Sequence, residues 1–290
     1  MVVKRNTRVL VLGVSGMLGN AIFRYFFYSD YFNVFGTARS KECFTFFSSD
    51  MQNHLISGVD VENTDALLNV IENVRPDVVI NCIGIVKQLD QSNNPLEVIP
   101  INALLPHRLA KICELISCRV IQMSTDCVYS GLKGMYTEID EPDAKDLYGV
   151  TKRLGELYCP NTVTLRTSII GRELNSNIGL IDWFLSQKDT VKGYDRAIFS
   201  GLPTVEVARV IRDYVIPNNK LTGLYHLSAE PINKLELLKL VANAYEKDIK
   251  IVPDSQFVID RSLDSAVFQR ETGYKPPAWE HLVVKLRDFG

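Results

Sequence analysis

The start of the chain places an unbroken apolar run before a helical repeat of apolar positions. Residues 8–12 form the run, a glycine closes it, and apolar side chains recur at helical spacing over residues 17–27. This order predicts a buried strand, a tight turn and an amphipathic helix. Further buried strands are expected at residues 33–38, 77–82, 119–124 and 162–166, and helices near residues 65–73, 96–116 and 146–157.

Strands that alternate with helices indicate a parallel sheet, so residues 1–170 are expected to form a Rossmann-like, doubly wound α/β domain. Beyond Gly171 the alternation loosens. We expect residues 171–290 to form a smaller α+β substrate-binding lobe over the C-terminal strand ends, with some segments returning to the first domain. Its expected elements are helices near 178–186, 204–216 and 234–245, a strand at 223–227, and a last helix after Trp279.

Composition removes several classes of function. The 290 residues carry 32 Lys+Arg and 34 Asp+Glu, a formal charge of −2 that argues against a nucleic-acid binder. No apolar stretch approaches the ~18 residues of a membrane span. The six cysteines form no CxxC pair, which indicates reduced thiols and a cytoplasmic protein. The four histidines do not cluster, so no catalytic metal is expected.

A glycine-rich turn lies between the first predicted strand and helix, with three glycines spaced GxxGxxG. Glycine lets the backbone approach phosphate oxygens, and a helix N-terminus offers unpaired N–H donors. The position of the turn favours a dinucleotide pyrophosphate site over a merely tight turn. The predicted contacts are Gly13, Ser15, Gly16, Met17, Leu18 and Gly19.

The following strand ends predict the rest of the cofactor path. Arg39 and Ser40 follow the second strand, where an acidic residue usually serves NAD and an arginine pairs with a 2′-phosphate. NADPH is therefore the expected cofactor, with NADH as the second possibility. Asp60 and Val61 are expected near the adenine. The nicotinamide side is expected at the end of the fourth strand, at Cys82, Ile83 and Gly84.

The fifth predicted strand ends in Ser-Thr-Asp, and a YxxxK motif lies on the helix that follows. The spacing of four places Tyr148 and Lys152 on one helix face. A lysine cation favours phenolate, so we expect Lys152 to lower the pKa of Tyr148 and let it exchange a proton near neutral pH. Thr125 is expected to orient the substrate oxygen. Thr125, Tyr148 and Lys152 are the predicted catalytic residues, and the last two are also predicted cofactor contacts.

Taken in order, these motifs resemble the extended short-chain dehydrogenases/reductases, and more narrowly the dTDP-4-dehydrorhamnose reductase family. The similarity also covers Asn102, Gly155-Glu156, and the stretches at residues 166–168, 201–204, 223–228, 261–264 and 277–279. It implies NADPH-dependent reduction of the 4-keto group of a nucleotide-linked 6-deoxy sugar, in surface-polysaccharide or deoxysugar precursor synthesis. It adds Asn102 as a cofactor contact, and a homodimer is the expected assembly.

The resemblance also implies a set of substrate contacts, to which Arg166 is added because a cation at a strand's C-terminal end points toward the ligand crevice. For Arg166 the alternative is a structural ion pair, and for Trp183 it is core packing. The family usually has an aromatic residue at the Cys127 position and an acid at Ser130, so a different 4-keto sugar is open. The predicted substrate contacts are Lys87, Asp126, Cys127, Tyr129, Arg166 and Trp183.

Two other functions fit the same scaffold. One is an NAD-dependent sugar-nucleotide epimerase or dehydratase, which Arg39 disfavours. The other is a non-catalytic NADP-binding regulatory subunit, which has no need of the Thr125, Tyr148 and Lys152 combination.

Overall fold

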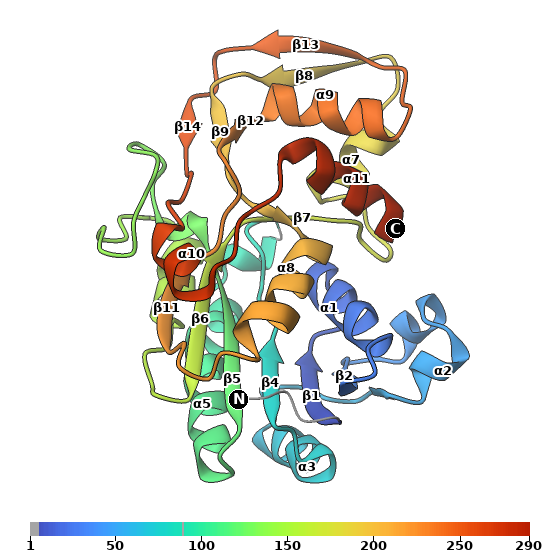
Figure 1. The fold of residues 1–290 in the computed structure, drawn as a ribbon, viewed down its shortest axis with the longest axis vertical. Coiled ribbons are helices and arrows are strands. Elements are labelled where there is room, and N and C mark those ends of the chain that lie inside the picture. The colour runs from blue at the N-terminus through green and yellow to red at the C-terminus, as the bar shows by residue number, and fades with distance from the viewer. Residues whose placement is uncertain (1–5, 89) are drawn as a thin grey trace.

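The computed structural model describes residues 6–88 and 90–290, and its centre is a seven-stranded parallel sheet in the order β11-β6-β5-β4-β1-β2-β3 (Figure 1). The expected doubly wound α/β fold is confirmed. The strands of this sheet are β1 (Thr7–Leu12), β2 (Phe32–Thr37), β3 (Leu55–Ile56), β4 (Val78–Asn81), β5 (Arg119–Thr125), β6 (Thr162–Thr167) and β11 (Gly223–His226).

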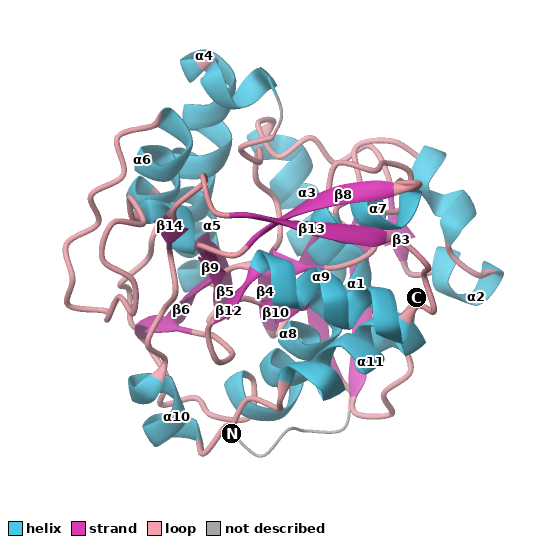
Figure 2. Cartoon of the chain, turned by 90° about the horizontal axis from the view of Figure 1, so that it is seen from above, coloured by secondary structure: helices cyan, strands magenta, loops and turns pink. Residues whose placement is uncertain are grey.

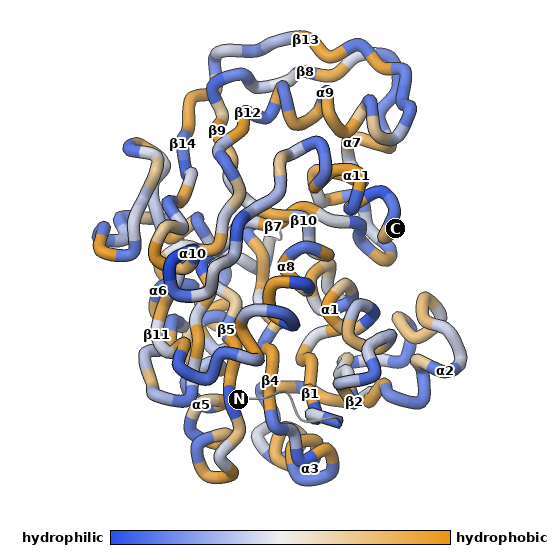
Figure 3. The backbone as a smooth tube through the Cα atoms, viewed as in Figure 1, coloured by the Kyte–Doolittle hydropathy of each residue, from blue (hydrophilic) through white to orange (hydrophobic). Residues whose placement is uncertain are grey.

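Both faces of the sheet are buried. Because successive side chains of a strand point to opposite faces, each strand contributes to two separate apolar cores. In β1, Val9 and Val11 join one apolar core, and Leu10 and Leu12 join the other. The first core contains side chains from α1 (Met17–Phe27) and α8 (Thr204–Val210), and the second contains side chains from α3 (Thr64–Val74) and α5 (Leu105–Leu115). Figure 3 shows the resulting apolar strands between amphipathic helices.

The strand order reverses between β1 and β4, which are parallel neighbours although β2 and β3 intervene in the sequence. At such a switch point the loops after the two strands diverge to opposite faces and leave a crevice at the carboxyl edge. The glycine-rich turn after β1 and residues 82–84 after β4 both lie at this edge. The predicted cofactor path therefore runs across the switch point of the sheet, and it stays a prediction.

A second lobe, called the upper lobe below, lies over the carboxyl edge of the sheet (Figures 1 and 2). It contains a three-stranded sheet in the order β12-β9-β14 and a parallel β13-β8 pair, with α9 packed close by. The chain returns to the first domain at β11, which extends the central sheet beside β6. The remaining elements outside the central sheet are α2 (Ser49–Gln52), α6 (Leu147–Leu154), β7 (Ile169–Ile170), α7 (Leu180–Ser186), β8 (Thr190–Tyr194), β9 (Ala197–Phe199), β10 (Leu202–Pro203), β12 (Ile232–Asn233), α9 (Lys234–Ala244), β13 (Lys250–Asp254), β14 (Ile259–Asp260), α10 (Ala266–Thr272) and α11 (Trp279–Phe289).

Two long predicted helices are interrupted. The one expected at residues 96–116 consists of α4 (Pro95–Val98), a π-helical segment η3 (Ile99–Leu104) and α5. Pro100 and Pro106 have no N–H to donate, so the regular α-helical ladder cannot run through them. The helix expected at residues 204–216 likewise continues from α8 into a π-helical segment η5 (Ile211–Val215).

The close approach of α1 to the turn before it gives a test of the fold. A Cβ on Gly19 would lie 2.1 Å from the Gly13 carbonyl oxygen, whereas a Cβ on Gly16 would be 3.5 Å from the same oxygen. Gly19→Ala should therefore lower the free energy of unfolding by about 1–3 kcal/mol or more through overpacking. Gly16→Ala should cost less than about 1 kcal/mol, since it only weakens an N-cap. Urea unfolding of both variants checks this, and equal costs would contradict the packing.

Candidate active site

The glycine-rich turn lies at the carboxyl end of β1, on one side of the switch point. Gly13 has φ 88°, and a Cβ there would lie 2.8 Å from the Ile83 side chain, so β1 and β4 meet closely at this point. Among the described residues no side chain caps the start of α1 at Gly16, and its first turn contains no acid. Ser15 and Gly16 are exposed, Met17 is half-buried, and Leu18 and Gly19 are buried. The free N–H donors of this helix start suit an anion.

The adenosine end of the predicted path follows β2 and β3. Arg39 and Ser40 are exposed directly after β2, in a position to meet a solvent-facing phosphate. Asp60 is also exposed, but its carboxylate accepts a hydrogen bond from the Glu62 N–H at 3.0 Å and so shapes its own turn. Val61 is buried in the core beneath α3. The adenine-contact role of Asp60 and Val61 stays a prediction.

The loop after β4 is fixed by one buried amide. Asn102 in η3 accepts a hydrogen bond from the Ile85 N–H at 2.9 Å and donates to the Ile85 carbonyl at 3.0 Å. A Cβ on Gly84 would lie 3.3 Å from the Asn102 oxygen and 3.7 Å from the Lys152 ammonium. Asn102 is therefore occupied with holding the loop, and Gly84 is the residue that lets this loop lie against Lys152.

Tyr148 is brought to Thr125 by a short helix that packs closely on the end of β5. Asp146 caps α6 by accepting from the Gly149 N–H at 3.0 Å. A Cβ on Gly149 would lie 2.4 Å from the Cys127 carbonyl oxygen, so only glycine allows this approach. The Thr125 hydroxyl accepts from the Cys127 N–H at 3.1 Å and donates to the Asp126 carboxylate at 3.2 Å. The close backbone contact between Gly149 and Cys127 thus brings Tyr148 next to Thr125, as expected.

The titration of Tyr148 differs from the sequence expectation. Burial raises its pKa above the ordinary value, Cys127 adds to the rise, and Thr125 partly offsets it. The expected lowering by Lys152 is wrong for this arrangement, because the Lys152 ammonium donates to the Met123 carbonyl at 2.7 Å. A raised pKa keeps the phenol protonated at neutral pH, which is the form that a general acid needs.

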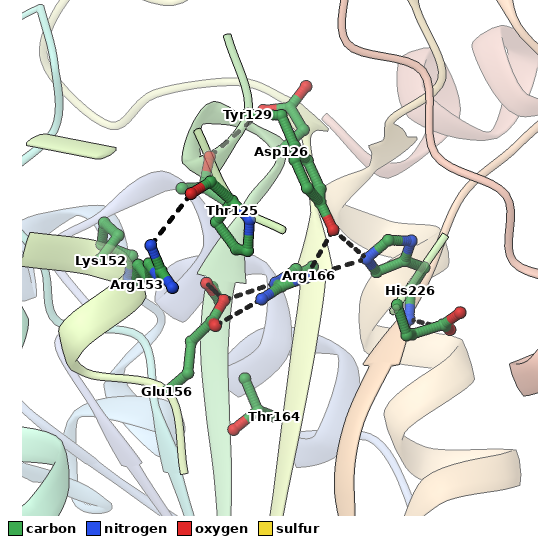
Figure 4. Close-up of polar contacts among 12 residues, drawn as sticks. Thr125, Asp126, Tyr129, Lys152, Arg153, Glu156, Thr164, Arg166 and His226 are labelled. Atoms are coloured by element: carbon green, nitrogen blue, oxygen red, sulfur yellow. Dashed lines mark hydrogen bonds and ion pairs between the residues drawn. The ribbon is translucent and has the colours of Figure 1, made fainter. Parts of the chain in front are cut away.

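Arg166 and Tyr129, two of the predicted substrate contacts, belong to a buried hydrogen-bond network (Figure 4). Arg166 is 2% exposed and forms a two-pronged ion pair with Glu156, at 2.6 and 2.7 Å. Arg166 also donates to the Tyr129 hydroxyl at 2.6 Å, and Tyr129 is fully buried. The neighbouring His226 ring is buried as well, and desolvation lowers its pKa to about 4. The alternative of a structural ion pair is therefore the arrangement that Arg166 adopts.

The remaining predicted substrate contacts differ in exposure. Lys87 donates to Asp146 at 2.9 Å and so joins the loop after β4 to the start of α6. Trp183 is 36% exposed in α7 of the upper lobe. Asp126 is buried beside Thr125, which raises its pKa, and Cys127 is half-buried beside it, which raises the pKa of the thiol to about 12.

Two cations near Asp126 were not among the predicted site residues. Arg261 is the largest charge opposing the rise of the Asp126 pKa, and it donates to the Tyr129 carbonyl at 2.9 Å. Lys234 starts α9, lies 4.0 Å from the centroid of the Phe199 ring, and also faces Asp126. Burial lowers the pKa of Lys234 to about 8. Arg261 lies in a stretch that the family resemblance covers, whereas nothing in the local sequence distinguishes Lys234 from a surface lysine.

A model of the family described as RmlD substrate binding domain matches residues 7–288. The chain belongs to this family. The "dTDP-4-dehydrorhamnose reductase" of Aggregatibacter actinomycetemcomitans is 23% identical over 310 residues, 97% of this chain and 99% of its own length. The RmlD-family chain also resembles the "dTDP-4-dehydrorhamnose reductase" of Bacillus anthracis solved "in complex with NADP", with a TM-score of 0.79, 19% identity, and coverage of 98% and 99%. At that identity the likeness shows the fold.

A second kind of relative belongs to the comparison. The "Methionine adenosyltransferase 2 subunit beta" of Danio rerio is 26% identical over 252 residues, 82% of this chain and 74% of its own length. The matches to the mammalian proteins of the same name are shorter, and they span less than half of the relatives' length. The chain is thus similar to proteins named as reductases and to proteins named as subunits.

In the described part of the chain, no group of three or more His, Cys, Asp or Glu residues is placed to hold a metal ion. The helices of that part are all too short or too polar to cross a membrane.

The Asn102 clamp yields a stability prediction. Asn102→Ala removes two hydrogen bonds from a residue only 1% exposed, so unfolding should become easier by about 2–3 kcal/mol. Asn63→Ala is a matched control, because Asn63 also bonds two backbone groups, at the exposed start of α3, and should cost about 1 kcal/mol. Chemical denaturation compares them. An Asn102 variant no weaker than the Asn63 variant would show that the clamp does not hold the loop.

Proposed function

We propose that this chain is an NADPH-dependent reductase of the 4-keto group of a nucleotide-linked 6-deoxy sugar. The observation that carries the proposal is that the carboxyl end of β5 brings Thr125 to Tyr148 and holds the Lys152 ammonium at the Met123 carbonyl. The names of the reductase relatives support the same chemistry.

Two features at the switch point suit a dinucleotide. The uncapped start of α1 suits a pyrophosphate, and exposed Arg39 suits a 2′-phosphate. Gly84 lets the loop after β4 lie against Lys152, and we assign the Lys152 ammonium to a ribose hydroxyl of the cofactor. NADPH supplies a hydride when bound.

The chain's own groups handle the oxygen of the substrate. The Thr125 hydroxyl is placed to hydrogen-bond the keto oxygen, and the Tyr148 phenol gives that oxygen its proton as negative charge develops on it. Lys152, whose pKa burial lowers to about 8, is cationic at neutral pH, and its ammonium donates to the carbonyl of Met123, two residues before Thr125 on β5. The catalytic contribution of the protein is therefore position and charge at one oxygen atom.

We place the sugar between the catalytic edge and the upper lobe. Asp126 and Cys127 lie there together with two cations, of which Arg261 donates to the Cys127 Sγ atom at 3.7 Å and Lys234 faces Asp126 from α9. Trp183 and Lys87 are proposed outer contacts, and Tyr129 and Arg166 are proposed to support this wall from behind. The carboxylate and the two cations suit hydroxyl groups and an anionic diphosphate.

We also propose a homodimer formed through α4, η3 and α6. Leu96 is 85% exposed, Leu154 57% and Ile99 43%, an apolar group that water disfavours. All six cysteines are free thiols, which supports a reducing compartment such as the cytoplasm.

The β-subunit relatives favour one other function, a regulatory subunit that binds a partner enzyme. The isolated chain decides between them. A reductase oxidises NADPH when given a 4-keto sugar nucleotide, whereas a regulatory subunit oxidises none.

Tyr148→Phe tests the proton donor. In an assay of NADPH loss against a panel of dTDP-, UDP-, GDP- and CDP-linked 4-keto-6-deoxy sugars, the variant should keep its cofactor affinity and lose about 10²–10⁴ in kcat. Tyr31→Phe, at a tyrosine that is 60% exposed, is the control and should retain full activity. Near-normal turnover by Tyr148→Phe would assign the proton to another group, and no turnover of any sugar by the native protein would favour the regulatory subunit.

Arg39→Ala tests the cofactor. Loss of one charge-assisted hydrogen bond should raise the Kd for NADPH about 10- to 150-fold, or roughly 1.5–3 kcal/mol, and leave NADH binding nearly unchanged. Lys41→Ala removes an exposed cation two residues away and should change neither. Nicotinamide fluorescence titration measures both constants. Equal affinity of the native protein for NADH and NADPH would remove the basis for this assignment.

A further inference from the structure

Behind the catalytic helix lies a buried carboxylate that the proposed reaction does not use. Glu156 follows α6 immediately after Gly155 and is 4% exposed. Its Oε1 atom accepts from the Ser124 hydroxyl at 2.7 Å and from Arg166 Nε at 2.6 Å, and its Oε2 atom accepts from Arg166 Nη2 at 2.7 Å. Figure 4 shows this carboxylate facing Arg166.

The contacts of Glu156 join the parts of the site that must stay in register. Ser124 lies between Met123, whose carbonyl accepts from the Lys152 ammonium at 2.7 Å, and Thr125. Arg166 is on β6, the next strand. One carboxylate therefore fastens the end of the helix that carries Tyr148 and Lys152 to the strand end that carries Thr125.

The surroundings of Lys152 make Glu156 its main source of negative charge. The ammonium is buried beside the Met123 carbonyl of β5, the Gly84 backbone and the Cys82 thiol after β4. Burial raises the pKa of Cys82 to about 12, so that thiol is neutral at physiological pH. Tyr148, one turn earlier on α6, is neutral as well, because its pKa is raised. That leaves the Glu156 carboxylate as the charge that opposes the desolvation of Lys152.

We infer that Glu156 is a positioning residue of this site, which keeps Lys152 cationic and holds Thr125 and the catalytic helix in register. The inference rests on the proposed function for its catalytic consequence only. The state of Lys152 itself is a property of the folded chain and can be measured without any substrate.

The sign of the effect follows from charge. Lys152 has a pKa near 8, so it is cationic below that pH and neutral above it. Removing the Glu156 charge disfavours the cation and moves the titration to lower pH, by about one unit for a close opposite charge. A reaction that needs cationic Lys152 then loses its activity at a correspondingly lower pH.

The test removes both charges of the pair, because Glu156→Gln alone would leave Arg166 buried without a partner. In Glu156→Gln/Arg166→Met the loss of a positive charge can only raise the pKa of Lys152. A fall in that pKa must therefore come from Glu156. Glu156→Asp keeps the charge and should restore a titration close to that of the native protein.

A control separates charge from loss of stability. Thr164→Val removes the hydroxyl that bonds the Leu157 N–H at 2.9 Å, next to Glu156, and leaves the carboxylate in place. It should lower the melting temperature without moving the titration of Lys152.

The measurement is an NMR titration of protein labelled with ¹³C at lysine Cε, with the Lys152 signal identified by Lys152→Arg. A downward shift in the double variant, absent in Glu156→Asp and Thr164→Val, is expected, together with an equal shift of the alkaline limb of kcat/KM. An unshifted Lys152 signal in the folded double variant would overturn the inference even if the chain is a reductase. A shifted signal in a chain that reduces no sugar would instead leave the inference standing and refute the proposed function.

Discussion

The buried pair between Glu156 and Arg166 connects more of this molecule than any other polar contact described above. It joins the end of the catalytic helix to β6, and through Ser124 to β5. Arg166 continues the connection to Tyr129, which stacks on Tyr136 with ring centroids 4.1 Å apart. A buried charge pair is stable only when its remaining donors and acceptors are satisfied, and here hydroxyl groups satisfy them. The geometry at Thr125 and Tyr148 is thus set from behind the reacting face.

The other requirement is close backbone approach, which glycine supplies at the carboxyl edge. A Cβ on Gly19, Gly149 or Gly155 would lie 2.1, 2.4 or 2.0 Å from a carbonyl oxygen of a neighbouring segment. These contacts bring α1 onto the first turn, α6 onto the end of β5, and the end of α6 onto η3. Side chains larger than hydrogen would push each helix away from the crevice, so the same positions that allow the packing also fix the distances of the site.

The sequence predicts the parts of this structure that repeat a strong local pattern. Apolar runs such as residues 8–12 bury both faces of a sheet, and their order implies its parallel topology. The upper lobe was only outlined, because strands such as β12 and β14 have two residues each and carry no periodicity. The π-helical segment η3 is not predicted either, because the apolar spacing of residues 96–116 continues across the prolines that interrupt the helical hydrogen bonds.

Site residues divide in the same way. The closeness of Thr125 to Tyr148 could be predicted from a strand end and the helix that follows it, whereas the catalytic roles of Thr125, Tyr148 and Lys152 stay predictions. Arg166 and Tyr129 could not be separated from substrate contacts. Whether a cation at a strand end is open or paired depends here on Glu156, and the sequence does not show that Glu156 folds back onto Arg166 of β6. Lys234 needs the lobe's tertiary placement to reach Asp126.

The proposed sugar site combines groups held by the central sheet with a group held by the upper lobe, and this arrangement concerns its specificity for the sugar. The catalytic wall is fastened by hydrogen bonds that begin and end on strands β5 and β6, so its geometry belongs to the sheet. Of the two cations near Asp126, Lys234 comes from the upper lobe, where it contacts the Phe199 ring, whereas Arg261 donates to the Tyr129 carbonyl and is thereby tied to the catalytic wall. Exchanging Lys234 would change the charge next to Asp126 and leave the side chains of Thr125 and Tyr148 in place. The proposed function therefore separates the group that would select the sugar, on the lobe, from the groups that would reduce it, at the sheet.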